Sequence, residues 1–128
     1  MEPLALDHLV IAVSDLARAD AFYARVLGAV VQEHAPGRRS YRIAGQQINV
    51  HHPGVPPLLV ARVPVAPGNS DLCFVWPGSA EAAVAHLAEC GVAVEAGPVP
   101  RTGAQGLGLS VYFRDPDGSL LELIAYGS

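Results

Sequence analysis

The sequence predicts an α+β fold in which two βαβββ modules follow one another within a single domain. The first observation behind this prediction is an internal repeat, because residues 8–28 and residues 71–91 share the order strand, turn, amphipathic helix and terminal glycine. The second is that the match resumes at an offset of 73 after a ten-residue insertion, where residues 45–50 align with residues 118–123. With 128 residues and 51% hydrophobic composition, the chain can bury roughly two thirds of its unfolded surface.

The repeat also predicts where the modules begin and end. We expect one domain over residues 1–128, with module one at about 4–52, a connection at 53–69 and module two at 70–127. Five prolines and two glycines in residues 52–69 favour an irregular connection. The apolar stretch Leu58–Val63 inside it is expected to form an extra strand, to cover a sheet edge or to lie at a dimer interface.

Module one begins with a strand at residues 6–13, after which Ser14 and Asp15 can cap a helix. Apolar residues recur three and four positions apart over residues 16–27, which predicts an amphipathic helix that Gly28 ends. Three short strands are then expected at residues 29–33, 39–44 and 47–51.

Module two repeats this plan. A strand at residues 71–76, a Pro-Gly-Ser turn and a helix at residues 80–90 are followed by strands at 92–95, 109–114 and 120–126. Residues 97–106 are rich in glycine and proline, so we expect a loop there, either a mobile binding loop or a tolerated excursion.

Composition excludes several classes of function. The net charge is −4, there is no lysine, and the eight arginines form only one local cluster, at Arg38, Arg39 and Arg42, so nucleic acid is not an expected partner. No apolar run is long enough to span a bilayer and no signal sequence is present, so we expect no membrane partner and a cytoplasmic location. Cys73 and Cys90 are expected to be reduced structural thiols.

Four polar residues occupy two pairs of equivalent positions on otherwise apolar strands: His8, Asn49, Asp71 and Glu122. A carboxylate among aliphatic side chains is costly unless a cation or strong donors meet it, which favours a metal or polar-ligand site. His51 lies one pleat beyond Asn49 and is an alternative fourth ligand. Structural roles are the alternative, since a strand histidine such as His8 is often bonded to a backbone carbonyl and Asp71 could cap a strand.

Two sets of motifs carry a family resemblance. They are Leu6-Asp7-His8-Leu9-Val10 with Phe22-Tyr23-x-x-Val26-Leu27-Gly28, and Val111-Tyr112-Phe113-Arg114-Asp115-Pro116-Asp117-Gly118 running into Leu121-Glu122. With these motifs the chain resembles the vicinal oxygen chelate superfamily of glyoxalases, bleomycin-resistance proteins and extradiol dioxygenases. Residues 70–74 and 97–104 are most similar to the small glyoxalase-domain-containing proteins of that superfamily.

The resemblance implies that the paired modules form a cupped mixed sheet around one divalent ion. It places the ligands at His8, Asp71 and Glu122, with Asn49 at an optional fourth position. The family commonly has His at the position of Asp71, and Glu or Gln at that of Asn49 when glyoxalase I activity is present, so that activity is not expected. Fosfomycin resistance is also disfavoured, because Val10 stands where a hydroxyl residue is usual.

The favoured function is therefore a divalent-metal-dependent enzyme, a lyase, isomerase or dioxygenase, that chelates two vicinal oxygens of a small substrate. The ion would be Mn, Ni, Zn, Mg or Fe(II), and one imidazole with two carboxylates favours Lewis-acid chemistry over oxygen activation. We expect Glu122 and Tyr112 to be catalytic, Arg101, Tyr112 and Trp76 to contact substrate, and the protein to be a homodimer, as the family is. The alternatives are a metal-free binding protein of the bleomycin-resistance kind and a dimeric scaffold.

Overall fold

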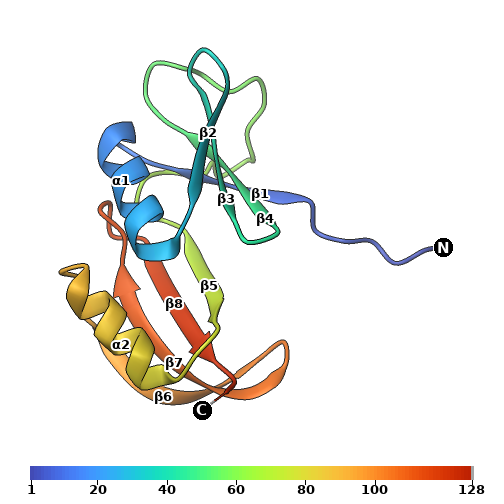
Figure 1. Ribbon diagram of the computed structural model, residues 1–128. Coiled ribbons are helices and arrows are strands. Elements are labelled where there is room, and N and C mark those ends of the chain that lie inside the picture. The colour runs from blue at the N-terminus through green and yellow to red at the C-terminus, as the bar shows by residue number, and fades with distance from the viewer. Residues whose placement is uncertain (128) are drawn as a thin grey trace. The chain divides into compact units, whose positions relative to one another are not determined.

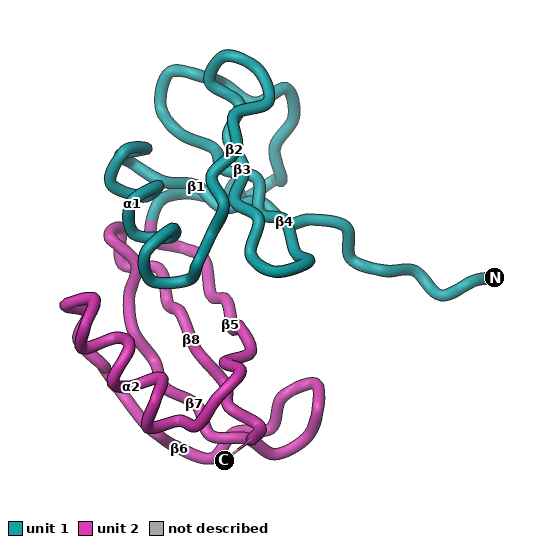
Figure 2. Tube along the Cα trace, in the orientation of Figure 1, with its two compact units in different colours: residues 1–67 teal, residues 68–128 magenta. Residues whose placement is uncertain are grey.

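The computed structural model describes residues 1–127 and divides into two compact units, residues 1–67 and residues 68–128 (Figure 2). Each unit contains one βαβββ module and one four-stranded sheet (Figure 1). The α+β class and the repeated module that the sequence predicts are confirmed.

Unit 1 is built on a sheet with the strand order β1-β4-β3-β2. Its first and last strands pair in parallel, while the other neighbours are antiparallel. The elements are β1 (His8–Ala12), α1 (Leu16–Leu27), β2 (Val30–Ala35), β3 (Arg38–Ile43) and β4 (Gln46–His51). Asp15 caps α1 by accepting a hydrogen bond from the Arg18 amide, and Gly28 ends it with φ of 68°.

One face of the unit 1 sheet carries the core. Ile11, Tyr41 and Ile48 are buried there together with Tyr23 of α1, and the rings of Tyr23 and Tyr41 stack at 5.0 Å between centroids. The Tyr41 hydroxyl donates to Asp20 Oδ1 at 2.7 Å, so the buried ring brings its polar end to a partner on the helix. Because strand side chains alternate, the intervening residues form a second, polar face.

Unit 2 repeats this arrangement with the strand order β5-β8-β7-β6, and β5 again pairs in parallel with β8. Its elements are β5 (Asp71–Trp76), α2 (Ala80–Glu89), β6 (Ala96–Gly103), β7 (Gly106–Arg114) and β8 (Leu120–Ala125). Helix α2 contacts β7 and β8, and Leu87, Val111, Phe113 and Leu121 are buried in this unit.

The strand registers reproduce the repeat residue by residue. In unit 1, Val10 pairs with Asn49, and in unit 2 the residues at the same offsets, Cys73 and Glu122, pair with one another. Asn49 and Glu122 therefore occupy equivalent places in the two sheets.

Two expected features of the connections are wrong, and for Leu58–Val63 one of the three alternatives, the extra strand, is excluded. Residues 92–95 are not a strand, because the ladder to β7 begins only at Ala96. The expected loop at 97–106 is a β-hairpin of β6 and β7 instead, and its prolines are tolerated because β6 lies at the sheet edge. Leu58–Val63 forms no strand, and the residues Leu58 and Leu59 are 90% and 83% exposed.

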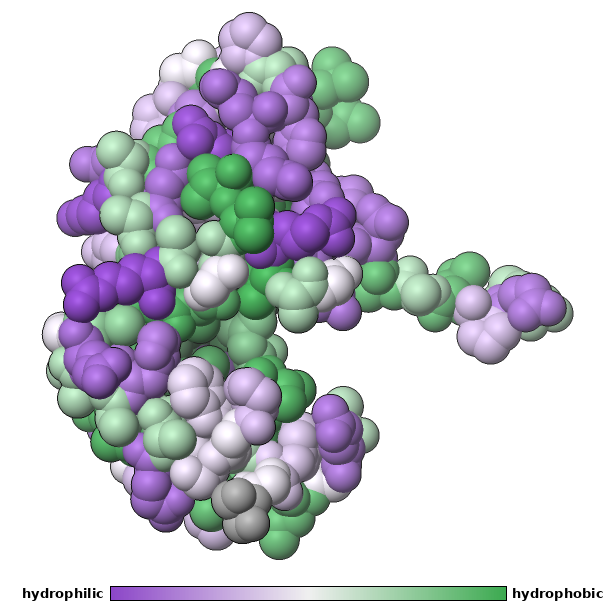
Figure 3. Space-filling model, viewed as in Figure 1, coloured by the Kyte–Doolittle hydropathy of each residue, from purple (hydrophilic) through white to green (hydrophobic). Residues whose placement is uncertain are grey.

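The surface of unit 1 over the β2–β3 hairpin is largely hydrophilic (Figure 3). Within residues 1–127, no helix has both the length and the apolar character needed to cross a membrane.

We predict that Tyr41→Phe lowers the free energy of unfolding by about 2 kcal/mol, because it removes a hydrogen bond to a carboxylate from a fully buried site. Urea denaturation of the variant and the wild type would measure the loss. A free energy within about 0.5 kcal/mol of wild type would contradict a stabilising role for the bond to Asp20.

Candidate functional site

A row of three side chains crosses the centre of the unit 2 sheet. Glu122 on β8 pairs with Cys73 on one side and with Tyr112 on the other. Directly paired residues share a face, so the carboxylate, the thiol and the phenol lie together on the face opposite the core. The sequence predicts Glu122 and Tyr112 to be near one another, and the register places them side by side.

The Glu122 carboxylate has no basic partner within residues 1–127. The Cys73 thiol beside it is also ionisable. Burial of the sulfur, followed by the charge and hydrogen bonding of Glu122, raises the pKa of Cys73 to about 12, although the residue as a whole is exposed. The thiol therefore stays protonated beside the carboxylate at neutral pH.

Arg101 and Tyr112 form a pair on the same sheet. Arg101 Nε donates to the Tyr112 hydroxyl at 3.2 Å, and its guanidinium carbon lies 5.8 Å from the ring centroid. Since the hydroxyl oxygen accepts from the guanidinium, the phenolic hydrogen can be donated to another acceptor. Arg101 lies in strand β6 rather than in the loop that the sequence predicts.

Asp71 lies one pleat from this row, on the same face of β5 as Cys73. It pairs with Leu120, whose other neighbour is Arg114. The Arg114 guanidinium is held by Glu95 through two hydrogen bonds of 2.6 and 3.1 Å, which lower the pKa of Glu95. Asp71 and Glu122 thus present two carboxylates on one face, neither of them in an ion pair within residues 1–127.

A cavity of about 240 Å³ opens beside Glu122. It is lined by Cys73, Val75, Thr102, Gly103, Ala104, Glu122, Ile124 and Tyr126. The Tyr126 hydroxyl accepts a hydrogen bond from the Gln105 amide at 3.2 Å, which holds the ring beneath the β6–β7 hairpin. Tyr126 was not among the predicted site residues, yet its position four residues after Glu122 puts it on the same face and could have revealed it.

In unit 1, the polar face of the sheet carries His8. The His8 Nδ1 atom lies 2.7 Å from Asp7 Oδ2, and the ring stands across from Gln47 on β4. A hydrogen bond from Nδ1 to a carboxylate leaves Nε2 as the nitrogen with a free lone pair, the arrangement typical of a metal-binding histidine.

Asn49 shares this face with Gln47, whose amide nitrogen donates to Asn49 Oδ1 at 2.9 Å. Gln47 was also missed in the sequence, although strand alternation places it beside both His8 and Asn49.

Two predicted site residues lie apart from these groups. Trp76 occupies the other face of β5 and contacts His86 of α2 at 5.2 Å between ring centroids, so it packs on the helix instead of lining the cavity. His51 pairs with Ala12, whereas His8 pairs with Gln47. His51 therefore lies four residues, or about 13 Å along the strand, from the level of His8 in the sheet. Trp76 therefore does not line the cavity, while His51 lies one pleat beyond Asn49 on the polar face of β4.

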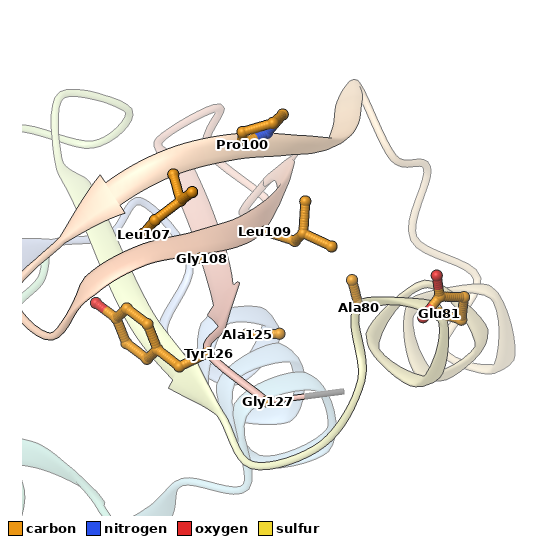
Figure 4. A pocket seen from close by; sticks show the side chains of 9 residues that line it. All are labelled: Ala80, Glu81, Pro100, Leu107, Gly108, Leu109, Ala125, Tyr126 and Gly127. Carbon is orange, nitrogen blue, oxygen red and sulfur yellow. The ribbon is translucent and has the colours of Figure 1, made fainter.

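A second hollow, of about 450 Å³, lies on the helix side of the unit 2 sheet (Figure 4). Its walls come from the first turn of α2, strands β6 and β7 and the end of β8. Glu81 is its one ionisable carboxylate, and Leu107 and Leu109 make its wall largely apolar. It contains none of the predicted site residues.

No three His, Cys, Asp or Glu side chains are gathered closely enough to hold a metal ion within residues 1–127. The donor groups described above are the imidazole of His8 and the two carboxylates that share one face of the unit 2 sheet. These donor types suit a divalent first-row ion.

The comparisons with known proteins identify the family of the chain. The family model of the glyoxalase/bleomycin resistance protein/dioxygenase superfamily matches residues 5–123. The chain belongs to this superfamily. Its fold and the vicinal oxygen chelate resemblance predicted from the sequence are thereby confirmed.

Several relatives are similar over nearly the whole chain. Glyoxalase domain-containing protein RDO1 of Mycosarcoma maydis is 46% identical over 122 residues, covering 95% of this chain and 68% of that protein. Virulence protein STM3117 of Salmonella typhimurium is 37% identical, covering 94% and 83%. A solved structure, integron cassette protein VCH_CASS1 from the mobile metagenome of V. cholerae, is 40% identical, covers 98% of both chains and has a TM-score of 0.90.

More distant structures share the fold alone. The fosfomycin resistance protein FosX of Listeria monocytogenes, solved with Mn(II) and sulfate, is 24% identical with a TM-score of 0.66, covering 97% of this chain and 90% of that one. The antibiotic binding protein TnmS3 of Streptomyces is also 24% identical, with a TM-score of 0.71 and 98% coverage of both chains. This fold therefore occurs both in a protein solved with Mn(II) and in an antibiotic binding protein.

We predict that Cys73 alkylates slowly. A raised thiol pKa means that the thiolate appears only at higher pH, and at pH 9 a pKa of about 12 leaves about one thousandth of the thiol ionised. In a Cys90→Ser background, iodoacetamide should therefore react with Cys73 at pH 9 far more slowly than with the unfolded chain.

Glu122→Gln should increase that rate several-fold, because removing the neighbouring negative charge lowers the pKa of Cys73. Equal alkylation rates with and without the Glu122 charge would show that the carboxylate does not act on the thiol.

Proposed function

We propose that this protein is a divalent-metal-dependent enzyme that binds two vicinal oxygens of a small-molecule substrate, with lyase, isomerase or dioxygenase activity. The proposed ligands are His8, Asp71 and Glu122. This set follows the superfamily resemblance. Asn49 is the optional fourth ligand, and His51, one pleat further along the same face of β4, is its alternative.

The observation that carries the proposal is that the Glu122 carboxylate lies in a partly buried place without a basic side chain within residues 1–127 to balance its charge. Its carboxylate is half-buried at the centre of the sheet, beside a protonated thiol and without a basic partner in the described part of the chain. By contrast, the exposed Glu95 is held by Arg114. A cation at Glu122 would offset the cost of burying its charge.

The pair formed by Asp7 and His8 supports the same proposal from the other unit. A carboxylate that accepts from Nδ1 favours the tautomer in which the Nε2 lone pair is available to a metal ion.

The remaining residues would bind and orient the substrate. When bound, a divalent ion of this kind supplies Lewis acidity at the oxygens that it chelates. Tyr112 can donate its hydroxyl hydrogen to a substrate oxygen, because Arg101 already occupies a lone pair of the same oxygen atom. The cavity beside Glu122 would hold the rest of a small molecule, with Val75 and Ile124 excluding water from it.

Our second candidate is metal-free binding of a small molecule or antibiotic, as in bleomycin-resistance proteins. The apolar lining of the same cavity favours it. Trp76 offers no stacking surface there, because it packs on α2. The superfamily resemblance also leads us to propose a homodimer in the cytoplasm, and light scattering after size exclusion would test the dimer.

The decisive measurement is metal binding. Protein purified without added metal and then titrated with Mn²⁺, Ni²⁺, Zn²⁺, Mg²⁺ and anaerobic Fe²⁺ should bind one ion per chain. His8→Ala and Glu122→Gln should each reduce affinity at least a hundredfold, because each removes a ligand. Glu81→Gln, which neutralises a carboxylate on α2, is the matched control and should bind like wild type.

Asp7→Asn offers a finer test. It keeps the side-chain shape but weakens the hydrogen bond to His8, so the metal affinity should fall about tenfold. Folded wild-type protein that binds no divalent ion would refute the metalloenzyme and leave the metal-free binding protein.

A further inference from the structure

One residue of unit 2 belongs to the walls of both hollows. Tyr126 lines the cavity of about 240 Å³ beside Glu122 and also the hollow of about 450 Å³ on the helix side of the sheet. Within residues 1–127, no other residue lines both. Tyr126 directly follows Ala125, the last residue of β8, so it stands where the strand ends (Figure 4). The two hollows therefore adjoin at Tyr126.

The hairpin of β6 and β7 holds the Tyr126 ring in place. The amide of Gln105, in the turn of this hairpin, donates to the Tyr126 hydroxyl at 3.2 Å. Gly103 lies directly against the same hydroxyl, because a Cβ at position 103 would collide with the hydroxyl oxygen and come within 2.9 Å of Ile124 Cδ1. Figure 4 shows this hydroxyl pointing away from α2.

Space, and not backbone conformation, explains the glycine at position 103. Its φ lies outside the left-handed region that favours glycine, whereas Gly106 at the other end of the turn has φ of 105°. An alanine could therefore adopt the backbone of Gly103, but its methyl group would displace the phenol. Glycine within a strand often marks the close approach of another group, and here that group is the Tyr126 hydroxyl.

We propose that Tyr126 determines the size of the ligand that the cavity beside Glu122 accepts, and that Gly103 is a positioning residue for its ring. The phenol closes the cavity at the end of β8 and restricts the ligand to an apolar group the size of one ring. This inference deepens the proposed function, because it rests on the use of this cavity by a small molecule and specifies the class of that molecule. All the residues that it uses belong to unit 2.

The volumes support this size limit. A protein cavity of about 150 Å³ can hold one benzene molecule, so 240 Å³ leaves room for one ring with a short substituent but not for two rings. Val75 and Ile124 form part of the apolar wall around such a ring. Beyond Tyr126, Leu107 and Leu109 of the second hollow would bury a longer apolar group if the phenol were absent.

Anchoring of the hairpin is the alternative role of Tyr126, and two substitutions separate it from the role of a wall. Tyr126→Phe removes the hydrogen bond to Gln105 and keeps the ring, whereas Tyr126→Ala removes both. An anchor depends on the hydroxyl, so both substitutions would alter ligand selection alike. A wall depends on the ring, so only Tyr126→Ala alters it.

The test uses two probes on the full chain in EDTA, benzyl alcohol and 4-propylbenzyl alcohol, whose hydroxyl group can donate to Glu122. Affinities come from amide shifts in nitrogen–proton NMR spectra. In wild type and Tyr126→Phe, the longer probe should bind no more tightly than the shorter one. In Tyr126→Ala it should bind at least about tenfold more tightly, because the propyl group is then buried. Only there should it shift the amides of Leu107 and Leu109.

Gly103→Ala tests the positioning role. Its methyl group should displace the phenol and break the bond to Gln105, so the Gln105 amide hydrogen should exchange with solvent as fast as in Tyr126→Phe. An exchange rate equal to that of wild type would show that Gly103 does not position the ring.

Three results would overturn the size limit: tighter binding of the longer probe by wild type, the same preference in Tyr126→Ala as in wild type, or no binding of either probe by wild type. If Tyr126→Ala is unfolded by circular dichroism, Tyr126→Leu takes its place, since leucine is apolar and has no ring. The metal titration tests the proposed metal dependence separately. A chain that binds no ion but selects the probes as expected would refute the metal-dependent function and leave this inference standing.

Discussion

The parallel pairing of the first and last strands of each module is the constraint on which the rest of the structure depends. A parallel pair needs a crossover, and in both units the crossover includes a helix on one face of the sheet. That face becomes the core, and every second residue of the paired strands is left on the other face. The pairing also brings together residues that are far apart in the chain, so Val10 meets Asn49 and Cys73 meets Glu122. The candidate site arises from this topology, with the hairpins adding Tyr112 and Arg101 at its border.

Local signals in the sequence were sufficient for the helices and for most strands. The cap at Asp15, the apolar periodicity and the glycine after it place α1 at residues 16–27 as observed, and β5 is likewise found at its predicted residues. The β6–β7 hairpin was mistaken for a loop because prolines and glycines normally interrupt strands, and only the position of β6 at the sheet edge makes them acceptable. That position is a property of the whole sheet and cannot be read from residues 97–106 alone.

In the site, too, the sequence predicted candidate residues, whereas the orientation of their side chains depends on residues of neighbouring strands and helices. The repeat was enough to single out Glu122 and its counterpart Asn49. It could not show that Trp76 faces the helix, since a strand end can direct an aromatic ring to either face until its packing is known. Nor could it show the orientation of the Asn49 amide. That orientation depends on Arg42, which comes from a neighbouring strand and whose effect passes through Gln47.

The prolines of β6 have a consequence for how this protein meets other chains. Pro98 and Pro100 lie in the outermost strand of the unit 2 sheet, Pro98 at the irregularity between Ala96 and Val99, and the nitrogens of both carry no hydrogen. An incoming strand that tried to extend the sheet would meet an edge that is irregular and lacks these two donors. The hairpin that borders the cavity is thereby protected against sheet-to-sheet aggregation, so this edge can stay open to solvent while it shapes a binding pocket.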